Sequence, residues 1–559
     1  MHLFQIKNMN EKDMNSFPSL PPIPHPLRSS IRAYRRGIAP LLLIVAMAGY
    51  LWLSLHITFH RQDHLVTSVF DLGIFDQAVW LISRGHSLFL NTRGLNVFAD
   101  HFDPILFFFA PVYWVWANPK ALLFAQCLAC AMGAYPIYRL AERRLGRSTF
   151  GLLFAGLYLC YPSLQWMNNF DFHPETLAIP FLLYSFWYME SKRWGAFSIM
   201  VILTLLCKET AGLTIAMIGA YLFFTKERYA GGITIAAGVI GMIIALGFLR
   251  MENQGRPSAY ISLYADFGNS PVSILVYLLT HPLEVLAHVS TPDNMQYWVD
   301  LLFPLLFLPL LAPRCFAIAL PALLANMLSN REAMHGIHYQ YNALVIPPLF
   351  YAAIAGGQVV LDSYRKIGNP IHRVAMRSFT LISLLAVFLF SWTTGAFTAG
   401  VDWNSGVSDD RLEAIREGLA LIPPNASVCA QTAIGAHLTD RQYMYMLPNP
   451  FQESAWGNSR KALLNQLGED FTPKPTKTLI SRIRNSHVDF IILGPQDSSF
   501  FPLSWADYHL FVRILLTDPD YGVIWAKEII ILKRGANHTQ GMQLLRNSKW
   551  EGFSNNAAQ

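Results

Sequence analysis

The sequence has 559 residues, of which 53% are hydrophobic and only 14% are charged. Soluble domains carry roughly 25% charged residues, so a soluble protein of this length would lack the polar surface needed to cover its core. The formal net charge is +6, but the basic residues form short clusters between apolar runs, which indicates membrane topology and not a nucleic-acid surface. The composition therefore predicts an integral membrane protein with no nucleic-acid partner.

The first 37 residues are polar and rich in proline, and they end in a cluster of arginines. We expect them to form a disordered, basic cytoplasmic arm. A transmembrane domain should follow over 38–398, because a helical span needs about 20 mainly apolar residues and eleven apolar runs fall in this region. The runs lie near 38–57, 120–140, 149–166, 175–190, 194–207, 210–225, 230–249, 297–312, 314–329, 342–361 and 378–397.

The distribution of Lys and Arg predicts the orientation of these spans. With a cytoplasmic N-terminus, most of the loop lysines and arginines fall on the cytoplasmic side, as the positive-inside rule requires. The odd number of spans then places the C-terminal part outside the cytoplasm. The first outer loop, 58–119, is long, and within it 104–118 is apolar but short and contains Pro111. We expect this stretch to lie in the membrane interface, with Tyr113, Trp114 and Trp116 at headgroup depth.

The apolar bias stops near Ala399, and 399–535 has the pattern of an extracytoplasmic soluble α/β domain. Alternating and helical periodicities predict its elements. These are a helix at 409–421, strands at 427–431 and 488–493, a helix at 504–516 and a hairpin at 522–533. The remainder, 536–559, is polar, and we expect a disordered tail.

Acidic and imidazole side chains concentrate at the outer ends of the predicted spans. Ionisable groups beside lipid are costly, so they are candidates for function. The candidates are Asp71, Asp76, Gln77, His101, Asp103, Asp171, His173, Glu175, Lys208, Glu209 and His338.

Several of these residues also have a purely structural interpretation. Asp71 could cap a helix that begins at Leu72. Asp71 and Asp76 are five residues apart, so on one helix they would point about 140° from each other. The acidic cluster 100–103 could be a solvated turn, and Lys208 could pair with Glu209 at a helix end.

Carboxylates and histidines in such numbers support two kinds of chemistry. They can bind a divalent cation such as Mg²⁺ or Mn²⁺. They can also supply a general base for a hydroxyl acceptor while cations such as Lys208 and Arg331 hold a phosphate leaving group. The spacing does not decide between them. A nucleotide enzyme is not indicated, because the sequence has no Gly-rich phosphate loop.

Several motifs resemble a prokaryotic membrane family, domain of unknown function 2079. The resemblance covers roughly 38–535. The segments that carry it are Phe70-Asp71-Leu-Gly-Ile-Phe-Asp76-Gln77, His101-Phe-Asp103-Pro104, Phe172-His173-Pro174-Glu175, Lys208-Glu209, Ile422-Pro-Pro-Asn-Ala-Ser-Val428, Leu438, and Tyr521-Gly-Val to Leu532-Lys-Arg-Gly535.

The layout more distantly resembles the GT-C superfamily of membrane glycosyltransferases, which take a sugar from a polyprenyl-phosphate donor. Asp71 falls where those enzymes have a first acidic residue, and 100–104 loosely resembles their second acidic element. This sequence departs from the pattern because Leu72 replaces a second acid and a single proline follows the His/Asp group. The resemblance implies a GT-C-like fold and an inverting transfer.

The resemblance also implies roles for the candidate residues. Asp71 would deprotonate or orient the acceptor. Asp103 would be the second catalytic residue, and with His101 and Asp171 or His173 it would complete the pocket or hold a cation. Lys208 and His338 would face the donor phosphate. The other substrate-binding residues would be Asp76, Gln77, Glu175 and Glu209.

The sequence thus predicts a multi-pass glycosyltransferase of the cell membrane, acting outside the cytoplasm on an acceptor that the sequence does not specify. Two alternatives stay open. A transporter or flippase should carry ionisable groups or broken helices near the bilayer midplane. A non-enzymatic scaffold would be insensitive to changes at Asp71.

Overall fold

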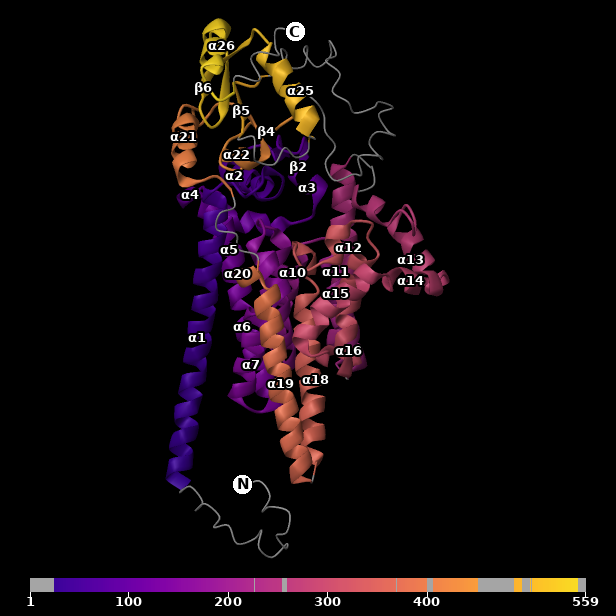
Figure 1. The fold of residues 1–559 in the computed structure, drawn as a ribbon. Coiled ribbons are helices and arrows are strands. Elements are labelled where there is room, and N and C mark those ends of the chain that lie inside the picture. The colour runs from indigo at the N-terminus through magenta and orange to yellow at the C-terminus, as the bar shows by residue number, and fades with distance from the viewer. Residues whose placement is uncertain are drawn as a thin grey trace, which may run out of the picture.

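A computed structural model describes residues 25–225, 227–253, 259–367, 369–399, 406–450, 487–494, 503 and 505–550. A long helical bundle makes up most of the molecule, and a small mixed sheet with its helices caps one end of the bundle (Figure 1). The cap follows the bundle in the sequence, as the composition shift near Ala399 predicts.

The first helix, α1 (His25–Asp63), runs along one side of the bundle toward the sheet (Figure 1). It begins inside the stretch for which we expected disorder, so that prediction is wrong for 25–37, and 1–24 lie outside the described residues. The physical reason is that Arg and Ala in this stretch favour helix, which extends the apolar helix backwards.

Three helices of the described chain are long and apolar enough to cross a membrane: Ile38–Asp63, Pro119–Leu145 and Arg228–Glu252. Of the other expected spans, α18 (Ile346–Lys366) and α19 (Pro370–Thr394) are continuous helices of 21 and 25 residues, and the rest are shorter or broken helices. The bundle consists of α5 (Pro119–Met132), α6 (Ala134–Leu145), α7 (Ser148–Leu159), α8 (Pro162–Asn169), α9 (Ala178–Glu190), α10 (Trp194–Leu205), α11 (Ala211–Phe224), α12 (Arg228–Glu252), α15 (Pro292–Leu302), α16 (Pro313–Phe316), α17 (Leu320–Met327), α18 (Ile346–Lys366), α19 (Pro370–Thr394) and α20 (Ala396–Ala399).

Prolines explain why several of these helices are short. Pro162 starts α8 and Pro313 starts α16, at first-turn positions where proline is tolerated because its missing N–H needs no partner. Inside a longer helix, the same residues would remove a backbone hydrogen bond and break it. The eleven apolar runs therefore fold as more than eleven helical pieces.

The first outer loop folds into short elements at the end of the bundle that faces the sheet. A π-helical turn (Val69–Gly73) leads into α2 (Ile74–Arg84). A small hairpin and three short helices follow: β1 (Phe89–Leu90), β2 (Leu95–Asn96), α3 (Val97–Asp100), a 3₁₀ helix (Pro104–Phe109) and α4 (Ala110–Val115). In the expected interfacial stretch, Trp114 is exposed, whereas Tyr113 is buried.

The stretch 250–296, which lies between two of the expected spans, contains helices of its own. A 3₁₀ helix (Ala259–Tyr264) is followed by α13 (Pro271–Thr280) and α14 (Pro282–Val289), which meet at an angle of 97°. Short 3₁₀ helices also connect α15 to α18: Phe303–Leu305, Leu308–Leu311, Ala317–Ala319, Glu332–His335 and Gln340–Asn342.

The C-terminal part forms a five-stranded sheet of order β4-β3-β5-β7-β6. Strand β3 pairs in parallel with β4 and β5, and the antiparallel hairpin β6–β7 extends the β5 edge. The elements are α21 (Asp409–Leu419), β3 (Val428–Ala430), α22 (Thr432–Gly435), β4 (Met444–Met446), β5 (Phe490–Leu493), α25 (Trp505–Leu516), β6 (Tyr521–Ala526), β7 (Ile530–Arg534) and α26 (His538–Arg546).

The structure corrects the prediction of a disordered tail, because residues up to 550 are folded. The helix α26 follows the hairpin directly and packs on β6, where Gly541 lies against the backbone of Val523. Leu545 and Trp550 are buried, and the Trp550 indole N–H donates to the Lys527 carbonyl at 2.8 Å. Polar composition predicted disorder, but these two apolar side chains anchor the segment to the sheet domain. Residues 551–559 lie outside the described chain.

Candidate active site

A cavity of about 410 Å³ opens at the end of the bundle nearest the sheet. Six segments that are far apart in the sequence line it. They are the π-helical turn with the start of α2, the stretch 90–103, the turn at 170–175, the α10–α11 turn at 208–214, the 3₁₀ helix at 260–264, and the stretch 321–344. The sequence offered candidate residues in all of these segments except 260–264.

Asp71 lies in the π-helical turn and lines the cavity. It is not a helix cap, because the Ser68 side chain fills that role by accepting the Phe70 N–H at 3.0 Å. The turn and α2 send Asp71 and Asp76 in different directions, as their spacing predicts. A π-turn within a helical segment is a common feature of functional sites.

His173 lies against Asp71, with His173 Nε2 3.4 Å from Asp71 Oδ1. The other ring nitrogen, Nδ1, is 2.9 Å from the backbone carbonyl oxygen of Asp171, which can only accept. His173 Nδ1 therefore carries a proton. A favourable contact between Nε2 and the Asp71 carboxylate then requires a second proton on the ring.

The charges around His173 favour this protonated form. Burial alone would lower the pKa of His173, but the hydrogen bond and charge of Asp71, the charge of Glu175 and the Asp171 carbonyl raise it above its ordinary value. The Asp71–His173 pair therefore holds one proton beside the cavity.

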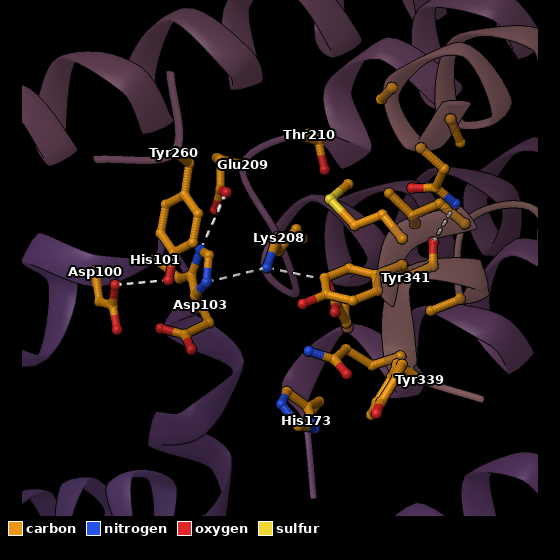
Figure 2. A pocket seen from close by; sticks show the side chains of 18 of the residues that line it. Asp100, His101, Asp103, His173, Lys208, Glu209, Thr210, Tyr260, Tyr339 and Tyr341 are labelled. Carbon is orange, nitrogen blue, oxygen red and sulfur yellow. Dashed lines mark hydrogen bonds and ion pairs between the residues drawn. The ribbon is translucent and has the colours of Figure 1, made fainter. Parts of the chain in front are cut away.

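A second cluster surrounds Lys208, between α10 and α11. Lys208 Nζ lies 3.0 Å from Glu175 Oε2 and 3.3 Å from His101 Nε2. His101 Nδ1 lies 3.2 Å from Glu209 Oε1, and Glu209 Oε2 accepts the Phe102 N–H at 3.2 Å. Figure 2 shows Lys208 between His101 and Tyr341. Lys208 therefore pairs with Glu175, and Glu209 pairs with His101.

The two acids beside this cluster respond oppositely to their surroundings. Burial would raise the pKa of Glu209, but His101 and Lys208 lower it to about 2. Burial raises the pKa of Asp103 well above its ordinary value, although Lys208 opposes the shift. Asp103 Oδ1 and Glu175 Oε1 are buried without a hydrogen-bond partner among the described residues. These two oxygens therefore have unused hydrogen-bonding capacity.

Aromatic residues and Arg331 complete the cavity wall. The Tyr260 ring stacks on His101 at 4.5 Å, and its hydroxyl donates to Asp100 Oδ1 at 2.8 Å (Figure 2). Arg331 Nη1 donates to the Tyr341 hydroxyl at 2.9 Å, and no carboxylate in the described parts of the chain lies within ion-pair distance of it. Tyr260 carries no local signal, because its place is decided by the path of the chain after α12.

Four of the expected binding residues do not line the cavity. Asp76 is fully buried and accepts hydrogen bonds from Tyr113 Oη at 2.5 Å and from Thr439 Oγ1 at 2.6 Å. Gln77 lies beside it, with its side-chain nitrogen 3.4 Å from the Arg441 carbonyl. Both residues connect α2 to the sheet domain, because α2 turns this face away from the cavity.

The other two lie behind the cavity wall. Asp171 accepts the Ser68 N–H at 2.8 Å and lies 3.6 Å from Arg61, so it fixes the start of the π-helical turn. His338 packs its ring against Trp166 at 4.7 Å. The candidate residues from the sequence that do line the cavity are Asp71, His101, Asp103, His173, Glu175, Lys208 and Glu209.

No group of three or more His, Cys, Asp or Glu side chains within the described residues is placed to hold a metal ion. The ammonium group of Lys208 lies between Glu175 and His101.

The profile of the family described as predicted membrane protein (DUF2079) matches residues 61–472. The chain therefore belongs to this family. No curated protein matches the chain by sequence.

Solved structures of GT-C glycosyltransferases resemble the fold. ArnT from Cupriavidus metallidurans in the apo state aligns with a TM-score of 0.50 at 12% identity, over 89% of this chain and 98% of that one. The Archaeoglobus fulgidus oligosaccharyltransferase in the apo form has a TM-score of 0.45 at 12% identity, over 86% and 73%. AglB from the same organism, with an inhibitory peptide and a dolichol-phosphate, has a TM-score of 0.42 at 12% identity, over 85% and 72%. The likeness to ArnT shows a GT-C-like fold.

Proposed function

We propose that this protein is a membrane glycosyltransferase that moves a sugar from a polyprenyl-phosphate donor to a hydroxyl acceptor. The observation that carries the proposal is the cavity itself: Asp71 faces it with a protonated partner, and Lys208 and Arg331 line the same space. A base and two cations around one cavity at the end of an apolar bundle suit a donor with a charged head and a long apolar tail.

In this reaction, Asp71 accepts the proton of the acceptor hydroxyl, and the hydroxyl oxygen attacks the anomeric carbon of the sugar. The bond between that carbon and the phosphate oxygen breaks, and its electron pair stays on the phosphate. Lys208 and Arg331 stabilise the negative charge that develops there. A single displacement of this kind inverts the anomeric centre.

The remaining cavity residues bind the sugar. Asp103, with its raised pKa, donates a hydrogen bond as a neutral carboxyl group, and the open Glu175 oxygen accepts one. The rings of Tyr260 and Tyr264 give the sugar faces to pack against. His101 and Glu209 hold Lys208 in place.

We also propose that the bundle crosses the cell membrane eleven times, with a cytoplasmic N-terminus and with the cavity and the sheet domain outside the cytoplasm. The sheet domain contacts the segment that carries Asp71, since Ser68 Oγ lies 3.0 Å from Thr432 Oγ1. It is therefore placed to position the acceptor. The charges gather around the cavity at the bundle end, which supports a transferase over a transporter.

The test compares lipid-linked and cell-surface glycans by mass spectrometry in deletion cells. The cells are complemented with wild type, with Asp71→Asn, or with Asp293→Asn, a matched change at an exposed residue outside the cavity. Membrane abundance of each protein is measured in parallel. We expect loss of a glycan and accumulation of its lipid-linked donor in the deletion, and rescue by wild type and Asp293→Asn only. Rescue by Asp71→Asn would contradict the base assignment, and unchanged glycans and donors in the deletion would contradict the function.

A further inference from the structure

The helical pair α13–α14 projects sideways from the bundle next to α12, on the bundle side of the sheet domain (Figure 1). Neither helix has a buried residue. Their apolar side chains are instead strongly exposed, including Leu279 at 73% and Leu283 at 79%. A patch of this kind in water would be an aggregation liability, so it needs a partner.

Several polar side chains of the pair form hydrogen bonds within it. Ser270 and Ser273 form a reciprocal capping box at the start of α13. The Thr280 hydroxyl donates to the Val276 carbonyl at 2.8 Å, and the Tyr277 hydroxyl donates to the Glu284 carboxylate across the bend. Internal satisfaction of this kind is what hydrocarbon requires of a segment and water does not.

Length and surroundings identify the partner. The helices have 10 and 8 residues, so neither spans a membrane alone, and the 97° bend between them keeps the pair from forming one straight span. Helix α12, beside the pair, exposes a run of isoleucines along a candidate membrane span.

We propose that α13–α14 is a re-entrant hairpin whose partner is the acyl-chain region of the leaflet at the cavity end of the bundle. The chain leading into it carries Tyr260 and Tyr264, so one wall of the cavity is anchored directly to lipid. This role does not depend on whether the protein transfers sugars.

The test uses single cysteines at Leu279 and Leu283 in a Cys160→Ser background, since Cys160 is the exposed native cysteine. Each is labelled with an environment-sensitive fluorophore in phosphatidylcholine nanodiscs. Quenching by lipids with a nitroxide on the acyl chain is compared with quenching by aqueous iodide. Ile243→Cys on α12, 61% exposed, is the lipid control, and Leu421→Cys in the sheet domain, 47% exposed, is the aqueous control.

We expect labels at 279 and 283 to be quenched by the lipid nitroxide as strongly as at 243, and several-fold more than at 421. Quenching mainly by iodide, as at 421, would overturn the proposal. Protection from both quenchers, with chemical cross-linking between two copies through the hairpin cysteines, would overturn it in favour of an interface with a second copy. Neither readout requires a sugar donor.

Discussion

His173 contacts Asp71 through Nε2 while its Nδ1 bonds to the Asp171 backbone carbonyl. The backbone carbonyl cannot donate, so the imidazole must carry both protons to meet a carboxylate. The two residues come from different loops, one before α2 and one before α9, and the bundle brings them to the same cavity wall. The stability that this contact contributes should therefore depend on pH.

His173→Gln should reduce stability most at low pH. The pKa of His173 is raised above its ordinary 6.5 in the folded protein, so its contribution is fully present below pH 6.5 and is lost as pH rises through the folded pKa. We expect a deficit of about 1.5–3 kcal/mol near pH 6, the range for hydrogen bonds to charged groups. Thermal unfolding from pH 5.5 to 9 measures it. His487→Gln, at an exposed position in the sheet domain, should show no such trend, and an equal deficit at all pH values would contradict the imidazolium assignment.

Asp103→Asn should be milder than Asp71→Asn. Burial raises the pKa of Asp103, so a neutral amide preserves its hydrogen-bonding shape, whereas Asp71→Asn removes a base and should cost on the order of 10²–10⁴-fold in transfer. The rate of glycan formation in membranes checks this order. If Asp103→Asn is as inactive as Asp103→Ala, transfer needs the ionised carboxylate, and the assignment of Asp103 as a neutral hydrogen-bond donor is wrong.

Lys208→Met should destabilise the protein, because it leaves the buried Glu175 without its ion-pair partner at 3.0 Å. Breaking a buried pair on one side costs about 3–5 kcal/mol. The double variant Lys208→Met/Glu175→Gln should recover much of the stability but none of the transfer, since the phosphate still lacks its cation. Melting temperature and glycan formation are measured together. Restored transfer in the double variant would show that Lys208 is structural only.

Asp76→Asn should remove a pH dependence of stability between pH 4 and 7. Burial raises the pKa of Asp76 from 3.8 to about 7, so in this window the folded state holds a proton that the unfolded state releases, and stability falls as pH rises. Asp76→Ala should instead loosen the sheet domain, because Thr439 loses its acceptor. Hydrogen exchange around β4 checks this. Unchanged exchange in Asp76→Ala would mean that this contact does not hold the domain.

The sequence by itself determined the helical membrane class and the change to a sheet domain. It also predicted most elements of that domain, such as the strand at 428–430. Hydrophobic periodicity and charge bias are local properties of the sequence, so they can be read without knowing the tertiary structure. The same local signals failed at α26, where polar composition concealed two anchoring side chains, Leu545 and Trp550.

Only the tertiary structure decided which candidates share a cavity. Asp71 and Asp76 have similar local surroundings in the sequence. Asp71 nevertheless lines the cavity, whereas Asp76 accepts a hydrogen bond from Thr439, which follows 363 residues later in the chain. Lys208 pairs with Glu175 and not with its neighbour Glu209. Contacts of this kind form between segments that are distant in the sequence. They depend on how the helices and the sheet domain pack, and no local sequence pattern encodes that packing.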